Sequence, residues 1–235
     1  MNALDLLVVG AHPDDGEVHV GGILALAARR GLSAAILDLT AGELGTRGDA
    51  ATRHAEAMEA ARILGVRRII MDLPDARFEE TEPHRIQVMK MLRSLRPTVL
   101  ILPDPDDRHP DHRRAFRLVK EAAYYSGLRN YPCPGEPWRP AALAWVGGEN
   151  PGRPDLVVDV SAVWEQRMAA FDAFGSQFTA DPSQPPTRIS DPAFRRGVEG
   201  RAMHWGSLIR VAWAEALWAD SPVPRELTQL LARLS

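Results

Sequence analysis

The chain is short of cysteine and of long apolar runs. Its only cysteine is Cys133, so neither an intrachain disulfide nor a Cys-x-x-Cys metal pair can form. No apolar stretch approaches the ~20 residues of a membrane-spanning helix. Asp5 interrupts the first apolar run, and no basic residue precedes that run as in a secretory signal. We therefore expect a soluble protein of the reducing cytoplasm that does not bind membranes.

Runs of positive charge are also missing. Lys and Arg total 28 against 31 Asp and Glu, which gives a formal net charge of -3, and no basic tract is long enough to indicate a nucleic-acid partner. The sequence has no internal repeat and no low-complexity segment. Its 235 residues, 45% of them hydrophobic, can bury a substantial core. We expect one domain over residues 1–235.

Short apolar runs alternate with helical patterns over residues 1–125. The expected strands are 6–9, 34–39, 68–72 and 98–102. The expected helices are 20–30, 49–64, 84–95 and 111–124, and Met58, Ala61, Ile63 and Leu64 could supply the buried stripe of the second. This alternation predicts an α/β fold with a Rossmann-like, mostly parallel sheet sandwiched by helices.

The remaining part of the chain, residues 126–235, is less regular. Its pattern predicts strands at 141–146 and 156–160 and a helix at 163–174. Residues 181–191 form a long loop, and loops of that length are often functional. We expect this C-terminal elaboration to complete the pocket of the regular core.

Two short clusters carry most of the chemical information. Ala11-His-Pro-Asp-Asp15 follows the first expected strand, and Arg108-His-Pro-Asp-His112 follows the fourth. In an open parallel sheet, the loops at the carboxyl ends of the strands meet at one edge, where ligands bind. The two clusters can therefore share one pocket although they are far apart in the sequence.

The residue types and their spacing predict a catalytic metal site. A catalytic zinc ion commonly has three protein ligands, often two histidines and a carboxylate, together with a water. His12, Asp15 and His112 are the expected ligands of one Zn²⁺ per chain, which Fe²⁺ could replace. Asp14 is left beside the metal as a general base that removes a proton from the bound water.

The second cluster supplies two further candidates. His109 could donate to the oxyanion that develops on an attacked carbonyl, and Asp111 could orient His109. Together these groups predict hydrolysis of an amide or an ester. An isolated His-Pro-Asp tripeptide is most often an ordinary turn, but two copies, each after an apolar run, favour the metal site. His19 could line the pocket or merely begin a helix, and His54 is expected to be solvated.

Four motifs resemble one known family. They are Gly10-Ala-His-Pro-Asp-Asp15, Asp38-Leu-Thr-Ala-Gly-Glu-Leu44, Arg53-x-x-Glu56 and Asp107-Arg-His-Pro-Asp-His112. They are similar to motifs of the PIG-L/LmbE family of zinc-dependent N-acetylglucosamine deacetylases. The similarity continues through Val157-Val-Asp-Val-Ser161 and Phe174-Gly-Ser-Gln-Phe178, and within the family it is closest to the bacillithiol biosynthesis deacetylases.

The resemblance implies a substrate, N-acetylglucosaminyl malate, from which the acetyl group is removed. It assigns the same metal ligands, base and oxyanion group as the spacing argument. It further implies that Arg53 and Arg108 hold the sugar or the malate carboxylates, and that the chain forms a homo-oligomer, a trimer or a hexamer. Phe194 stands where relatives commonly have a tyrosine, and His19 where they more often have a glycine.

Several alternatives remain at this point. The acceptor could be another N-acetylglucosamine conjugate or a chitooligosaccharide, because loops decide acceptor choice. The chain could instead be a non-catalytic module that binds a sugar or a nucleotide. The spare carboxylate of Asp14 disfavours this alternative. Two histidines and one carboxylate also suit an iron-dependent oxygenase, which the strand and helix alternation disfavours.

Overall fold

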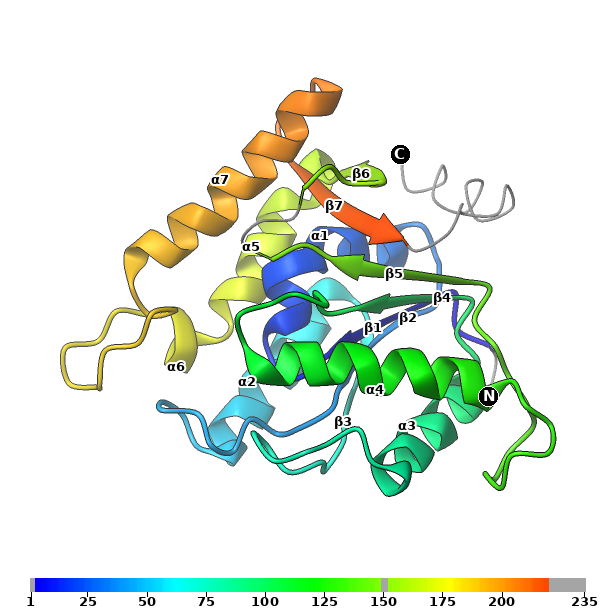
Figure 1. Cartoon of the computed structure of the whole chain (residues 1–235). Helices are drawn as coiled ribbons and strands as arrows, with labels where there is room; N and C mark the ends of the chain where they lie inside the picture. The colour runs from blue at the N-terminus through cyan, green and yellow to red at the C-terminus, as the bar shows by residue number, and fades with distance from the viewer. Residues whose placement is uncertain (1–2, 149–151, 220–235) are drawn as a thin grey trace.

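The computed structural model describes residues 3–148 and 152–219. A seven-stranded sheet of order β3-β2-β1-β4-β5-β7-β6 lies between two layers of helices (Figure 1). The strands are β1 (Leu6–Gly10), β2 (Ala34–Asp38), β3 (Arg67–Ile70), β4 (Val99–Leu102), β5 (Ala142–Val146), β6 (Leu156–Asp159) and β7 (Ala214–Ala219). β1 to β5 pair in parallel, and β7 is antiparallel to both β5 and β6. The predicted α/β fold with a mostly parallel sheet is confirmed.

Helices cover both faces of this sheet. They are α1 (Asp15–Arg29), α2 (Ala50–Leu64), α3 (Glu82–Leu95), α4 (Pro110–Ser126), α5 (Trp164–Asp172), α6 (Gly175–Phe178) and α7 (Pro192–Ile209). Successive strand residues point to opposite faces, so each central strand feeds two apolar cores. Val8 and Ile101 pack with α1, α2 and α5 on one face, whereas Leu7 and Leu100 pack with α3 and α4 on the other.

A buried ionic group ties three elements together near the edge of the sheet. Arg68 of β3 donates from Nε and Nη2 to the carboxylate of Asp38 at the end of β2, at 2.6 and 2.9 Å. Its Nη1 donates to Glu17 Oε1 at 2.6 Å. None of the three side chains is exposed to solvent. The group therefore fixes the first turns of α1 against the sheet.

The sequence pattern misplaced one helix start and one buried side chain. α1 begins at Asp15, five residues before the expected start at Val20, because the polar first turn hid the helix; Val20 itself has non-helical angles (φ -139°, ψ 25°). Met58 is 43% exposed, so its expected place in the buried stripe of α2 is wrong. The buried residues of that helix are Arg53, Ala57, Ala60, Ala61 and Leu64.

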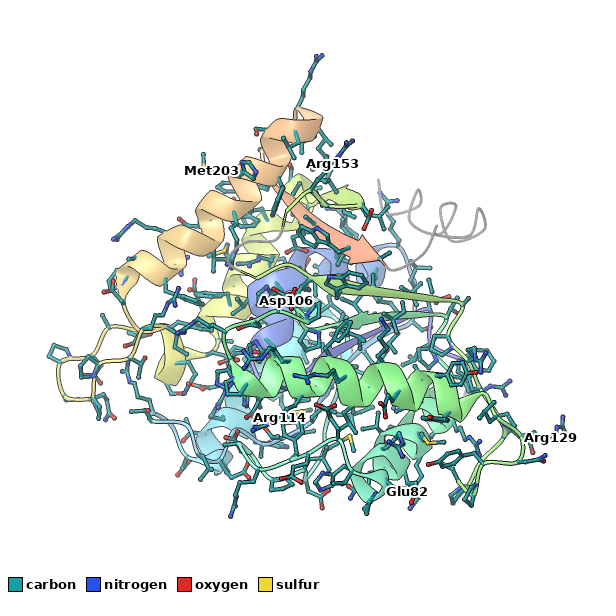
Figure 2. All side chains as sticks on the ribbon, in the orientation of Figure 1. Glu82, Asp106, Arg114, Arg129, Arg153 and Met203 are labelled. Carbon is teal, nitrogen blue, oxygen red and sulfur yellow. The ribbon has the colours of Figure 1, made fainter. Side chains whose placement is uncertain are left out.

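Two C-terminal elements were not expected from the sequence. β7 completes the sheet, and α7 extends from the body of the molecule at one corner (Figure 1). Asp191 caps α7 by accepting the N–H of Ala193, and Pro192 is the first residue of the helix, a recognisable start signal. Met203 lies on its outer surface (Figure 2). Within the described ranges, no helix is both long and apolar enough to cross a membrane.

Replacing Arg68 tests the buried ionic group. Arg68→Met leaves two carboxylates uncompensated in the interior, so we expect a loss of about 3–5 kcal/mol in the free energy of unfolding. Urea denaturation followed by circular dichroism measures it. Arg62→Met is the matched control, because its ion pair with Glu59 lies on the exposed surface of α2 and should leave the unfolding midpoint almost unchanged. Equal midpoints for the two variants would contradict the assigned role of the group.

Candidate active site

A cavity of about 720 Å³ opens at the carboxyl edge of the parallel strands. β1 and β4 are neighbours at the centre of the sheet, and the chain leaves them toward opposite sides, as at the ligand-binding switch point of doubly wound folds. Residues 12–19 and 107–112 line the cavity from these two strands. Its other sides are formed by residues 44–47 and by residues between 187 and 201. Residues 44–47 belong to the glycine-rich loop after β2, which contains Gly42, Gly45 and Gly48. The structure therefore brings the two sequence clusters together.

The loop after β1 is fixed by the carboxylate of Asp15. Its Oδ2 accepts the backbone N–H groups of Ala11 and His12 at 2.8 and 3.0 Å. A Cβ at Gly10 would lie 2.9 Å from the carbonyl oxygen of His12, so this tight turn requires glycine. The second oxygen, Oδ1, faces Nε2 of His112 at 3.2 Å. The bonded oxygen holds Asp15 in place while the other remains available as a ligand.

Each predicted histidine ligand has one ring nitrogen on a carboxylate. Nδ1 of His112 lies 3.0 Å from Asp107 Oδ2. Nε2 of His12 lies 3.1 Å from Asp75 Oδ1 and 3.3 Å from Asp111 Oδ2. Carboxylates in such positions fix the tautomer and ring orientation of metal-binding histidines. The remaining nitrogens, Nε2 of His112 and Nδ1 of His12, face Asp15, the latter at 4.0 Å from Oδ2.

The charges around these rings suit a cation. Burial lowers the pKa of His12, but the hydrogen bonds to Asp111 and Asp75 outweigh it and raise that pKa to about 9. Burial likewise lowers the pKa of His112, and Asp15 and Asp107 raise it well above the ordinary value. Nitrogens of His12, His109 and His112 also lie within 4.8 Å of one another. Three imidazoles are a donor set that fits a zinc-type ion, and Asp15 adjoins this set through His112.

Asp14 lies beside this cluster in a constrained and buried position. Its backbone has a φ of 112°, in the left-handed region that side chains rarely adopt. Burial raises the pKa of its carboxyl to about 6, although the neighbouring Arg53 opposes the rise. Asp14 Oδ2 accepts from Arg53 Nη2 at 3.2 Å. Asp14 therefore places a carboxyl group with a pKa of about 6 on the cavity wall. A pKa near the working pH suits a general base.

The two arginines expected to bind substrate occupy different positions. Arg53 lines the cavity but is buried, and it donates to the carbonyl oxygens of Pro13 and Gly42 as well as to Asp14. These contacts fix the carboxylate of Asp14 and join the loop after β1 to the loop after β2. Arg108 is exposed and lines the cavity, where it can reach a bound molecule.

Asp111 contacts His109 and His12 through different groups. His109 is the N-cap of α4, and its Nδ1 accepts the backbone N–H of Asp111 at 3.3 Å. The carboxylate of Asp111 instead contacts His12, the N–H of Ala76 at 3.1 Å, and Arg114 at 2.8 Å. Arg114 is labelled near the start of α4 in Figure 2, and Asp106 in the preceding loop. Asp111 therefore meets the His109 ring through its backbone N–H, whereas the turn directs its carboxylate toward His12.

Sequence reasoning missed Asp75, which follows β3. Its Oδ2 accepts the N–H of Leu44 at 2.9 Å, and its own N–H donates to Glu43 at 2.8 Å, so the glycine-rich loop holds it against His12. Asp75 follows a third parallel strand, whose carboxyl end lies at the same edge of the sheet as the two clusters. This position in the sequence could have indicated a site residue. His19, whose position was open, lies within α1 and lines the cavity; burial, helped by Arg201, lowers its pKa to about 3.

Comparison with known proteins identifies the family. Residues 7–123 match the family described as PIG-L, GlcNAc-PI de-N-acetylase. Diacetylchitobiose deacetylase of Thermococcus kodakarensis is 31% identical over 75% of this chain and 71% of the relative. The chain belongs to the PIG-L family. The expectation of an enzyme of the metal-dependent N-deacetylase class is confirmed.

Two further relatives define the breadth of the comparison. The crystal structure of the conserved protein TT1542 from Thermus thermophilus is 40% identical, with a TM-score of 0.86 and 94% and 96% of the two chains covered. 4-oxalmesaconate hydratase of Pseudomonas putida is 28% identical over 92% of this chain and 89% of the relative. Because this relative is named for a hydration, the substrate and the roles of single residues must be argued from the site.

Removing a ligand or its supporting carboxylate tests the metal site. We expect His112→Ala to abolish stoichiometric Zn²⁺ binding, and Asp107→Asn to weaken it about 10–100-fold because the imidazole loses its orienting partner. Isothermal titration of metal-stripped protein measures both. His54→Ala is the control, since this histidine is exposed on α2. Unchanged affinity in His112→Ala would exclude His112 as a ligand.

Proposed function

We propose that this PIG-L enzyme removes the N-acetyl group from an N-acetylglucosamine conjugate, and that its substrate is N-acetylglucosaminyl malate, an intermediate of bacillithiol biosynthesis. One observation supports the proposal that the reaction is a hydrolysis. Asp14 is a buried carboxylate outside the expected ligand set, yet it lies directly beside that set on the cavity wall. A binding module would have no use for a spare base in that position.

In the proposed mechanism, His12, Asp15 and His112 hold a Zn²⁺ ion. When bound, the ion lowers the pKa of a coordinated water toward ~7 and polarises the substrate carbonyl. Asp14 accepts the proton of the attacking water, and Arg53 keeps its carboxylate aimed at the cavity. His109, at the cavity wall, donates to the oxygen that becomes negative as the amide carbon turns tetrahedral. The C–N bond then breaks as Asp14 returns the proton to the leaving nitrogen, which gives acetate and the free amine of the sugar.

The choice of an anionic acceptor rests on the distribution of charge in the cavity. The end that contains the histidines carries Asp14, Asp15, Asp75, Asp107 and Asp111. Arg47, Arg188 and Arg201 come from other segments of the wall, together with Asp191, and Arg108 lies between Asp107 and His109 in the loop after β4. Guanidinium groups suit carboxylates because their planar fork donates two parallel hydrogen bonds. A neutral acetamido sugar at the acidic end and a dicarboxylate at the basic end would match this arrangement.

The neutral alternative is a chitooligosaccharide, which the relative from Thermococcus kodakarensis favours by its name. Acetate release from N-acetylglucosaminyl malate and from diacetylchitobiose, with metal-stripped and zinc-loaded protein, separates the two. We expect zinc-dependent release that favours the malate conjugate. Release from diacetylchitobiose alone would retain the chemistry and reject the acceptor, and no release from either by metal-loaded protein would reject deacetylation of these sugars.

Asp14 and His109 can be distinguished from the metal ligands by substitution. We expect Asp14→Asn to retain zinc and to lower kcat about 10²–10⁴-fold, because the amide cannot accept the proton. His109→Ala should lower kcat about 10²–10³-fold with a small change in KM, because it acts on the developing charge. Steady-state kinetics together with metal analysis measures both. Near-normal turnover by Asp14→Asn would reject the assignment of the base.

Arg108 tests the anionic acceptor. We expect Arg108→Gln to raise KM for N-acetylglucosaminyl malate about 10-fold, as the loss of a charge-assisted hydrogen bond does, and to leave KM for N-acetylglucosamine nearly unchanged. Arg62→Gln, on the exposed side of α2, is the matched control. An equal rise for both substrates would place Arg108 outside acceptor recognition.

A further inference from the structure

His19 occupies a special position among the cavities of the molecule. Besides the 720 Å³ cavity, two small cavities of about 30 and 10 Å³ lie in the described part of the chain. His19 is the one described residue that lines all three. Its imidazole therefore separates the reaction cavity from the two recesses behind it.

The smaller recess is apolar and adjoins the expected metal ligands. Asp15 and His112 line it together with His19. Its other walls are Val8, Val9, Gly16, Val20, Leu102, Pro103 and Val146. A volume of this size is at the lower limit for one water molecule, so a longer acyl chain needs the space of the imidazole as well. Val146 and His19 also line the 30 Å³ recess, whose walls include the charged residues Arg167, Arg201 and Glu215.

The two residues that precede His19 are held by buried arginines. Glu17 is bonded to Arg68 at 2.6 Å, and the carbonyl oxygen of Val18 accepts from Arg167 Nη2 at 2.8 Å. The ring therefore cannot move away with its segment of α1. The electrostatic neighbours of the ring are Arg201, Asp15, His112 and Asp107.

We infer that His19 sets the length of the acyl group that the enzyme removes. The inference rests on the proposed function, in which an amide carbonyl lies against the metal ligands. The sugar and its acceptor need the wide cavity, so the acyl chain points to the narrow apolar recess that His19, Asp15 and His112 line together. An acetyl group ends before the imidazole, whereas a longer acyl chain collides with it. Removal of the imidazole joins the recesses to the cavity.

Acyl-chain selectivity of the zinc-loaded enzyme tests this inference. The substrates are N-acetyl, N-propanoyl and N-butanoyl forms of one glucosamine conjugate, and kcat/KM is measured by amine release. We expect the wild-type enzyme to prefer acetyl over butanoyl, and His19→Ala to reduce that preference at least ~10-fold, within the range that one or two methylene groups contribute in an apolar pocket. His19→Leu, which keeps the bulk but not the imidazole, should retain the wild-type preference.

The controls separate volume from other effects. His54→Ala, exposed on α2, should leave the preference unchanged. Zinc content equal to that of the wild type excludes an effect on the metal site, and His19→Asn serves as a second small variant if His19→Ala folds poorly. An unchanged preference in the small variants, or an equal change in His19→Leu, would overturn the inference.

A binding measurement makes the inference independent of turnover. Acetate and butanoate are added to zinc-loaded protein, and their dissociation constants are obtained by titration calorimetry. We expect the ratio of butanoate to acetate affinity to rise at least ~10-fold in His19→Ala relative to the wild type. Should the wild-type enzyme release no amine from any acyl sugar, the proposed function fails, and this ratio still decides the role of His19. An unchanged ratio would overturn the inference alone.

Discussion

The parallel pairing of β1 with β4 is the constraint on which the site depends. Leu6, Leu7 and Val8 are in register with Val99, Leu100 and Ile101, so the two strands end side by side. Each strand is followed by a loop with a His-Pro-Asp tripeptide and then by a helix. Because the chain leaves the two strands in opposite directions, the cavity opens between the loops. Any shift in this register would separate Asp15 from His112, which now lie 3.2 Å apart.

The second constraint is the balance of charge at that edge. Four carboxylates, those of Asp15, Asp75, Asp107 and Asp111, contact the rings of His12 and His112. Partly buried carboxylates at such density need a compensating cation. Hydrogen bonds to Asp111 and Asp75 raise the pKa of His12, so a proton on this ring can offset part of the negative charge. A divalent metal ion supplies the compensating charge more compactly, which explains why these residues suit a metal site.

The cavity also divides by chemistry, and this division connects the proposals. Its acidic end holds the metal site and the base, its arginine-lined sides suit an anionic acceptor, and His19 closes its apolar corner. Another wall of the cavity includes Phe178 at the end of α6 and Phe194 in α7, whose rings stack with centroids 5.8 Å apart. Phe194 carries no hydroxyl, so oxyanion stabilisation in the proposed mechanism falls to the metal and His109.

The sequence alone determined the α/β fold, the two clusters and their meeting at one edge, because hydrophobic periodicity and the geometry of parallel sheets are local rules. Asp15 and His112 were found by their spacing after the strands. Tertiary structure decided what has no local signature. Asp75 reaches His12 from a loop that follows β3, the carboxylate of Asp111 contacts His12, and His19 meets three cavities. Those roles depend on side-chain direction across distant segments, which only the packed molecule fixes.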